Sequence, residues 1–281
     1  MRLISWNVNA RRTLVERQVT ALAEFCPDII ALQEVTPTSL LPFQIALRKA
    51  GYLHIVDSFS LAPVEFIPLG PRRYGLLLAS RYALAPQNPD LFQLPWPERV
   101  LSAAVQTPDG LVNIHNTHVP PGSSNGWVKV DHLIGLFDGL AHLHPNPCIL
   151  CGDFNTPQAE LSSGEVVTWG QRLKKDGSWR VARTIRGKAG AAWDEAERRV
   201  LIGLAEWGLQ DVFRCVNGYE ILDFSWFLNR KGDVIGRRFD HIYASTQLQP
   251  RTCEYIHGLR IQGLSDHSPI MADFAPQEKG T

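Results

Sequence analysis

The chain has 281 residues, of which 44% are hydrophobic and 20% are charged, a composition typical of a globular protein with a substantial core. Its 28 basic and 28 acidic residues leave no net charge, so no global field attracts a polyanion. No apolar run approaches the roughly 18 residues of a membrane helix, which argues against a membrane protein. The five sparse cysteines favour reduced thiols and a cytoplasmic location.

Hydrophobic periodicity and turn signals predict strands and helices that alternate along the chain. The first strand is expected to begin at Met1, so no signal peptide is expected. The expected elements are a strand at 1–6, a helix at 15–26, a strand at 28–32, a hairpin of 100–106 and 111–117, a helix at 127–141, a strand at 148–151, a helix at 194–207, and strands at 223–228, 238–244, 252–257 and 269–274.

This mixture of elements favours an α/β sandwich with two central sheets and outer helices over a bundle or an all-β barrel. Polar motif residues occur from Asn7 to His267, so a central cut would divide the proposed site. We therefore expect one domain at 1–276, followed by a disordered tail at 277–281. The irregular stretch 164–190 is expected to be a mobile insertion over the site.

Polar residues at strand ends suggest a site for a hard divalent cation. Mg²⁺ prefers oxygen ligands and keeps several waters, so one or two carboxylates and a substrate phosphate suffice. Glu34, which ends the strand at 28–32, is the best candidate ligand. Asn7 is a second candidate, through its carbonyl or by directing its amide toward phosphate, although alone it fits a turn equally well.

The string Gly152-Asp153-Phe154-Asn155 follows the strand at 148–151. On an extended segment Asp153 and Asn155 share one face and Phe154 takes the other. The carboxylate can then orient or deprotonate a water while the amide holds water or phosphate. In isolation the string fits an Asx turn as well.

The string Ser265-Asp266-His267 supplies an imidazole that can donate to a nonbridging phosphate oxygen. A neighbouring carboxylate would fix its tautomer and raise its pKa, and Asp240 is the candidate. Asp266 is a candidate ligand for metal or water. His118 can contact the phosphate or the leaving group, although a structural histidine is the competing interpretation.

Between Gln171 and Lys188 there are seven basic residues and one acidic residue, with Trp169 and Trp179 nearby. Contact with substrate phosphates and a solvated loop face are both open interpretations. Arg72 and Arg73 are further candidates for substrate binding. The spacing of Cys148 and Cys151 indicates a buried strand with the two thiols on opposite faces, which argues against a shared metal.

Together these strings resemble the endonuclease/exonuclease/phosphatase superfamily across nearly the whole chain. The matching strings, in the family's order, are Ser5-Trp6-Asn7, Leu32-Gln33-Glu34, Asn116-Thr117-His118, Gly152-Asp153-Phe154-Asn155, Phe239-Asp240-His241-Ile242 and Ser265-Asp266-His267. The resemblance implies a four-layered α/β sandwich whose sheets meet beneath a Mg²⁺ or Mn²⁺ site, where water attacks phosphorus in line. The resemblance does not identify the substrate, because members of the family cut many different phosphoesters.

The loop at 119–122 and the segment 224–227 look most like the exonuclease III type of abasic-site endonuclease. Three positions depart from that pattern: Asn9 stands where Asp is common, His118 where Tyr is usual, and Arg237 where an aromatic residue often walls the abasic-sugar pocket. Trp226 and Phe239 can still form an apolar wall.

The leading hypothesis is a Mg²⁺- or Mn²⁺-dependent DNA nuclease, of exonuclease or abasic-site type, with a repair role and a monomeric state favoured. Trp169, Trp179 and Trp226 offer surfaces on which bases can stack. A phosphatase or phosphodiesterase for a small or lipid phosphoester is the alternative that fits zero net charge. A binding module that has lost catalysis is the third hypothesis, against which the full set of polar residues argues.

Overall fold

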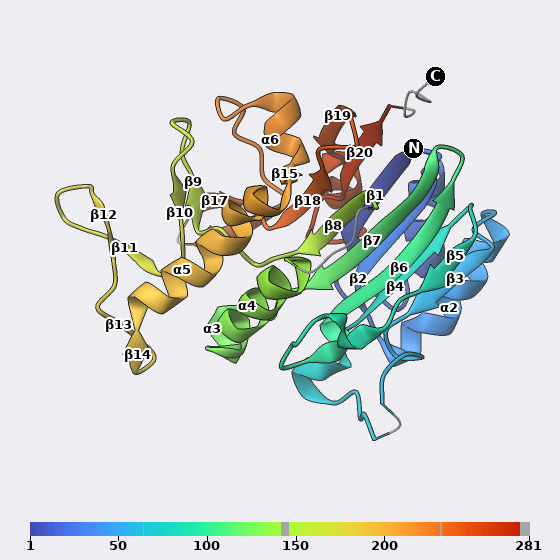
Figure 1. Ribbon diagram of the computed structural model, residues 1–281, viewed down its shortest axis with the longest axis horizontal. Helices are drawn as coiled ribbons and strands as arrows, with labels where there is room; N and C mark the ends of the chain where they lie inside the picture. The colour runs from blue at the N-terminus through green and yellow to red at the C-terminus, as the bar shows by residue number, and fades with distance from the viewer. Residues whose placement is uncertain (64, 142–145, 231, 276–281) are drawn as a thin grey trace.

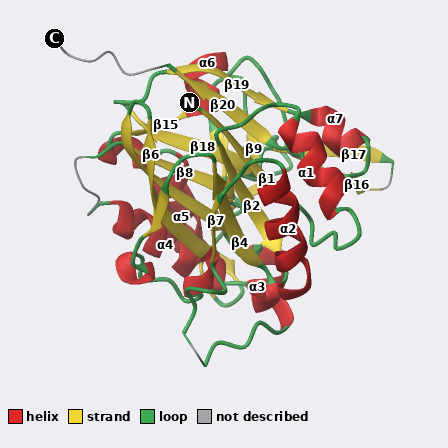
Figure 2. Ribbon diagram, turned by 90° about the vertical axis from the view of Figure 1, so that its right-hand side faces the viewer, coloured by secondary structure: helices red, strands yellow, loops and turns green. Residues whose placement is uncertain are grey.

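A computed structural model describes residues 1–63, 65–141, 146–230 and 232–275. Two six-stranded mixed sheets pack face to face, and helices cover the outer face of each, which gives four layers (Figure 2). The predicted α/β sandwich is therefore confirmed. The tail expected at 277–281 lies outside the described residues. Within them, no helix combines the length and apolar character needed to cross a bilayer.

The first sheet joins the two ends of the chain. Its strands, in spatial order, are β19 (Pro250–Tyr255), β20 (Ile270–Phe274), β1 (Arg2–Asn7), β2 (Ile29–Val35), β4 (Gly75–Ser80) and β3 (His54–Asp57). Helices α1 (Val15–Ala23), α2 (Pro37–Lys49) and α7 (His257–Ile261) lie on its outer side (Figure 2). Trp6 and Leu32 from the sheet pack there with Leu22 of α1 and Phe43 of α2.

The second sheet is built from the middle of the chain. Its strands are β15 (Leu209–Asp211), β18 (Asp240–Ser245), β8 (Cys148–Asp153), β7 (Gly110–His118), β6 (Val100–Thr107) and β5 (Leu84–Pro86). Helices α4 (Val128–Leu140) and α5 (Gly190–Leu201) cover its outer face. Leu150 and Phe154 from the sheet pack against Leu133 of α4 and Val200 of α5. Two short helices, α3 (Gly122–Asn125) and α6 (Val212–Asn217), lie beside these layers.

The central core lies between the sheets, where Leu3 and Ile29 of the first meet Ile114 and Ile149 of the second. Cys151 belongs to this core, whereas Cys148 belongs to the outer cluster beneath α4. The two thiols therefore lie on opposite faces of β8, as their spacing predicts, and all five cysteines are free.

Several predicted elements are corrected by the structure. The helix expected at 194–207 is α5 followed by a 3-10 turn, and α2 was not predicted, because Pro37 and Pro42 fall within it. The strand expected at 223–228 is β16 (Trp226–Arg230), which pairs with β17 (Asp233–Arg237). Further 3-10 helices cover Gly70–Arg73, Pro89–Leu91 and Pro97–Arg99.

The stretch expected to be irregular instead forms three small antiparallel hairpins around α5, in the left half of Figure 1. Their strands are β9 (Ala159–Glu160), β10 (Val166–Val167), β11 (Gln171–Leu173), β12 (Trp179–Val181), β13 (Thr184–Ile185) and β14 (Lys188–Ala189). We call residues 159–189 the hairpin insertion.

Candidate active site

The site lies where the carboxyl ends of four strands meet. β1 and β2 are parallel neighbours in the first sheet, as β7 and β8 are in the second. Their carboxyl ends carry Asn7, Glu34, His118 and Asp153, and side-chain contacts join these four residues across the two sheets. β18 begins at the same place with Asp240, which pairs in register with Asp153.

A bulge at the end of β2 directs Glu34 to the site. Pairing with β4 shifts register between Leu32 and Val35, and Glu34 adopts a left-handed backbone with φ of 58°. Gln33 instead points between the sheets, where its amide donates to Ser5 Oγ at 3.0 Å and to Asn116 Oδ1 at 2.7 Å. Gln33 and Asn116 thus bind the sheets together and do not reach the site.

Two carboxylates face the same amide. Nδ2 of Asn7 lies 3.3 Å from Oε1 of Glu34 and 2.9 Å from Oδ2 of Asp153. Oδ1 of Asn7 accepts a 2.9 Å hydrogen bond from the backbone N–H of Asn9. This bond fixes the amide with its nitrogen toward the carboxylates. Of the two orientations that the sequence left open for Asn7, the structure has the amide nitrogen directed into the site.

His118 is a buried, neutral donor in this arrangement. Its Nδ1 contacts a guanidinium nitrogen of Arg99. Because guanidinium nitrogens only donate, Nδ1 accepts and the proton of the neutral ring is on Nε2. That nitrogen lies 3.7 Å from carboxylate oxygens of both Glu34 and Asp153. Burial, with the Arg99 charge, holds the pKa of His118 well below its ordinary value.

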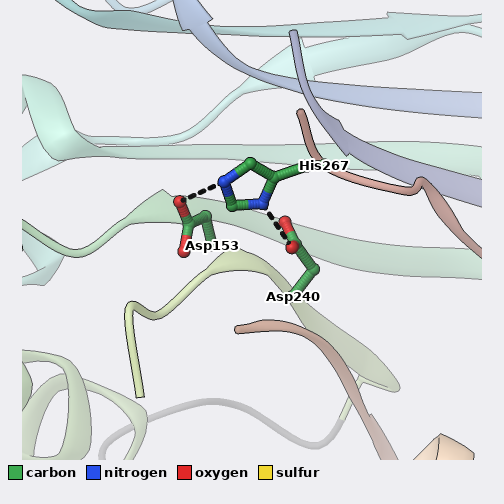
Figure 3. Close-up of side chains that lie close together, drawn as sticks. All are labelled: Asp153, Asp240 and His267. Carbon is green, nitrogen blue, oxygen red and sulfur yellow. Dashed lines mark hydrogen bonds and ion pairs between the residues drawn. The ribbon is translucent and has the colours of Figure 1, made fainter. Parts of the chain in front are cut away.

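His267, unlike the neutral His118, lies between two carboxylates, those of Asp153 and Asp240 (Figure 3). Its Nδ1 donates to Oδ2 of Asp240 over 2.7 Å, and its Nε2 lies 3.9 Å from Oδ2 of Asp153. Burial alone would lower the pKa of His267, but Asp240 and Asp153 outweigh it and raise this pKa to about 10. The imidazolium therefore holds its second N–H at the site at neutral pH.

The site has an excess of buried negative charge. Burial raises the pKa of Glu34 against the opposing effects of His267 and Asn7. Burial also raises the pKa of Asp153 to about 7, with His267 lowering it and Asp240 raising it further. Oxygen donors that carry uncompensated charge are what a hard divalent cation binds, so Glu34 and Asp153 fit Mg²⁺ or Mn²⁺.

A second grouping of donor atoms is less suited to a cation. Ligand atoms of Asp153, Asp240 and His267 all lie within 4.8 Å of one another. However, His267 Nδ1 donates to Asp240 Oδ2, and the protonated ring has no lone pair left to offer a cation. We therefore assign Asp240 to orienting His267 in this geometry, and leave the cation to Glu34 and Asp153.

The profile of the Endonuclease/Exonuclease/phosphatase family matches residues 4–267. The chain belongs to this family. It is 28% identical to exodeoxyribonuclease III of Haemophilus influenzae, over 98% of this chain and all of that protein. Solved structures with the same fold include an AP endonuclease from Archaeoglobus fulgidus, with a TM-score of 0.67 and 21% identity, covering 98% of this chain and 99% of that chain. A 3′ phosphatase from Neisseria bound to a product DNA hairpin has a TM-score of 0.67 and 22% identity, with the same coverage.

In this family member the site opens into a pocket of about 590 Å³. Trp226 and Phe239 form one wall, with ring centroids 5.4 Å apart and planes 23° from parallel. The indole N–H of Trp226 donates to Asp266 at 3.2 Å. Arg237 also lines this pocket, as does the exposed Asp266.

Three candidates for substrate binding are not among the residues that line the pocket. Arg72 makes two hydrogen bonds to the buried carboxylate of Glu98, and Arg73 stacks on Tyr74. Asn9 lies past the end of β1 with φ of 52°, where its backbone N–H supports Asn7. Of the seven basic residues between 171 and 188, two line the pocket, Arg172 and Arg186.

The backbone at Asn155 also differs from the extended one expected. Its φ is 52°, so the chain turns immediately after Phe154. The side-chain amide donates to the carbonyl of Val119 at 2.9 Å, which uses one of its two N–H groups. The Asn155 carbonyl accepts from Lys129 Nζ at 2.9 Å and from the Trp169 indole at 3.1 Å.

This carbonyl is held by a buried network that sequence reasoning missed. Lys129 on α4 bonds Glu197 on α5 at 2.6 Å, and both side chains are almost fully buried. Glu197 also accepts from the backbone N–H of Trp169 and the indole of Trp193. One signal was readable: Lys129 lies on the apolar stripe of its helix, where a lysine needs a buried partner. Arg99, within a 3-10 turn, carries no such signal.

Proposed function

We propose that the chain is a divalent-metal-dependent nuclease that hydrolyses phosphodiester bonds of DNA by in-line attack of water. The observation that carries this is the convergence of Glu34, Asp153 and a protonated His267 in one pocket. The nuclease activities named for the Haemophilus relative and the Archaeoglobus structure, and the DNA in the Neisseria structure, support DNA as the substrate.

The chain's own residues supply the acid and base groups. The carboxylate of Asp153 is placed to orient the attacking water and to accept its proton. His267 donates Nε2–H to a nonbridging oxygen and stabilises the charge that accumulates there. His118 presents a neutral N–H to the phosphate or leaving group, and the free N–H of Asn155 holds water or phosphate.

Glu34 and Asp153 would hold Mg²⁺ or Mn²⁺, with Asn7 and Asp266 next to them. When bound, such an ion neutralises phosphate charge and acts as a Lewis acid. Asp240 fixes the ring of His267 throughout. We further propose a single domain over 1–276, because both sheets contribute to one site, and a cytoplasmic location, which the five free thiols support.

A substrate panel with defined metals tests this function. We expect cleavage of abasic duplex or single-stranded DNA with Mg²⁺ or Mn²⁺, and none in EDTA, over a panel that also holds RNA, a tyrosyl-linked end and inositol phosphates. Glu34→Gln should lower kcat/KM by about 100-fold or more. It should also weaken Mn²⁺ binding measured by calorimetry without substrate.

Glu24→Gln is the matched control, because Glu24 is an exposed glutamate at the end of α1. It should keep wild-type rates and metal affinity. Full activity in EDTA contradicts the metal requirement. Turnover of inositol phosphates with no cleavage of any nucleic acid would replace the nuclease by the small-phosphoester alternative.

A further inference from the structure

Part of the pocket lining is cationic. The pocket is lined by Glu34, Asp153 and His267, and also by Arg172, Arg186 and Arg237. Arg172 and Arg186 come from the hairpin insertion, whose strands β11 to β14 lie at the far left of Figure 1. Arg237 ends β17. Two separate parts of the chain thus bring guanidinium groups to one pocket.

None of these three guanidiniums has a carboxylate partner within the described residues. Arg237 donates to the carbonyl of Gly236 at 3.0 Å, and Arg172 to the carbonyls of Trp169 and Gln171 at 2.8 Å each. Arg186 contacts the carbonyl of Ser123. Neutral carbonyls leave the positive charge uncompensated and leave further N–H donors free.

The next residue along the chain, Arg238, does have carboxylate partners. Arg238 turns away from the pocket and bonds Glu160 and Asp211, at 2.6 Å each. Arg237 and Phe239, on either side of it, both line the pocket. Arg237 is half-buried, and burial lowers its pKa with no acidic group to oppose the effect. A desolvated cation without a counter-ion favours an incoming anion.

Trp169 holds Arg237 in place. The guanidinium carbon of Arg237 lies 5.7 Å from the Trp169 ring centroid. The ring is itself fixed, because its indole N–H donates to Asn155 and its backbone N–H donates to Glu197 at 2.7 Å. The ring that Arg237 faces is therefore held by Asn155, two residues after Asp153.

We propose that Arg237, assisted by Arg172 and Arg186, forms a second phosphate subsite that binds the phosphate next to the scissile one. Planar guanidiniums bind phosphate oxygens through paired hydrogen bonds, which suits this role. The subsite makes a nucleic-acid strand with consecutive charged phosphates the substrate. This inference rests on the proposed nuclease function and adds the requirement for a charged flanking linkage.

Neutral-linkage substrates test the subsite. The cleavage position is first mapped on a parent DNA oligonucleotide, and then the linkage on one or the other side of it is replaced by an uncharged methylphosphonate. We expect one of these replacements to lower the wild-type kcat/KM by about 10-fold or more, since hydrogen bonds to charged groups contribute at least that much. In Arg237→Gln the same methylphosphonate replacement should lower kcat/KM by about twofold or less, because the guanidinium that binds the phosphate charge has already been removed.

Arg251→Gln is the matched control. Arg251 is an exposed strand arginine on β19 that does not line the pocket, and its variant should show the full wild-type penalty. Arg186→Gln, at an exposed position, should show a reduced penalty and serves if Arg237→Gln does not fold. Equal rates on all substrates, or an unchanged penalty in the Arg237 and Arg186 variants, would overturn the subsite. Absence of cleavage of the parent DNA would instead refute the proposed function.

Discussion

Replacing Asp240 by asparagine isolates the charge that controls His267. The substitution keeps the size of the side chain and removes its negative charge from a fully buried position 2.7 Å from Nδ1. Asp240 is the largest of the contributions that raise the pKa of His267 against the effect of burial. Asp240→Asn therefore should convert a permanently protonated imidazole into one that titrates.

The structure sets the size of this effect. The pKa of His267 rises from 6.5 to about 10, a difference that corresponds to roughly 5 kcal/mol of preference for the charged form, shared among its carboxylate neighbours. Without Asp240, burial is opposed chiefly by Asp153, so the pKa should fall to 6.5 or lower. The pKa of His267 is higher in the folded protein than in the unfolded chain. Its charged form therefore stabilises the folded state fully below about pH 6.5, and this stabilisation is lost as the pH rises through about 10.

Two measurements check this expectation. Nuclear magnetic resonance of the imidazole in EDTA should show wild-type His267 protonated at pH 8 and the ring of Asp240→Asn deprotonated there. With metal restored, kcat of the variant at pH 8 should be about 100-fold to 10,000-fold lower. Asp223→Asn is the control, because Asp223 forms a similar pair with His257, at 2.9 Å, outside the pocket.

The reasoning would be refuted by a wild-type His267 that titrates at or below pH 6.5 in the metal-free protein. Wild-type kcat in a folded Asp240→Asn protein would equally remove Asp240 from its assigned role. A loss of kcat in Asp223→Asn of similar size would attribute the effect to general destabilisation.

Two further predictions concern buried ion pairs around the site. Lys129→Met should lower the free energy of unfolding in urea by about 3–5 kcal/mol, because it leaves the buried Glu197 carboxylate without its counter-ion. Adding Glu197→Gln should restore part of this free energy. If the losses of the two substitutions simply add, the coupling between the two residues is contradicted. Arg238→Met should cost a similar ~3–5 kcal/mol at pH 7, and less at pH 4. In the wild type, burial raises the pKa of Asp211, but Arg238 outweighs it and holds that pKa below its ordinary value, so the carboxylate is still charged at pH 4. In the variant, burial acts without Arg238, so the carboxylate protonates as the pH falls and its destabilising charge is removed; an equal loss at both pH values would rule out this linkage.

Sequence pattern predicted those parts of the fold in which local preference and burial agree. The apolar spacing from Val15 onward gave α1, and a turn signal at 107–110 gave the β6–β7 hairpin. In α2 the prolines at 37 and 42 obscured the pattern, although Thr36 caps the helix and Pro37 begins it. Proline is tolerated in a first helical turn because its missing N–H would be unpaired there.

The site was predictable to the extent that its residues end strands. Asp240 and His267 could be paired because imidazole needs an orienting carboxylate, and the structure places them in contact. Arg99 and Glu197 could not be found, because nothing local distinguishes a buried, partnered charge from a solvated one. The ion pair of Arg72 with Glu98 could not be predicted either, because the two residues are 26 positions apart and the glutamate is buried.

The net charge of zero does not show that some basic residues are paired with buried acids while others are not. Lys129, Arg214 and Arg238 are bonded to buried acids, and so add little to the field outside the protein. The pocket lining combines the carboxylates at the strand ends with guanidiniums, those of Arg172, Arg186 and Arg237, that have no acidic partner in the described chain. Carboxylates suited to a cation and guanidiniums suited to phosphate therefore lie in one pocket. A charged strand is then oriented across the site without any excess of basic residues over the whole molecule.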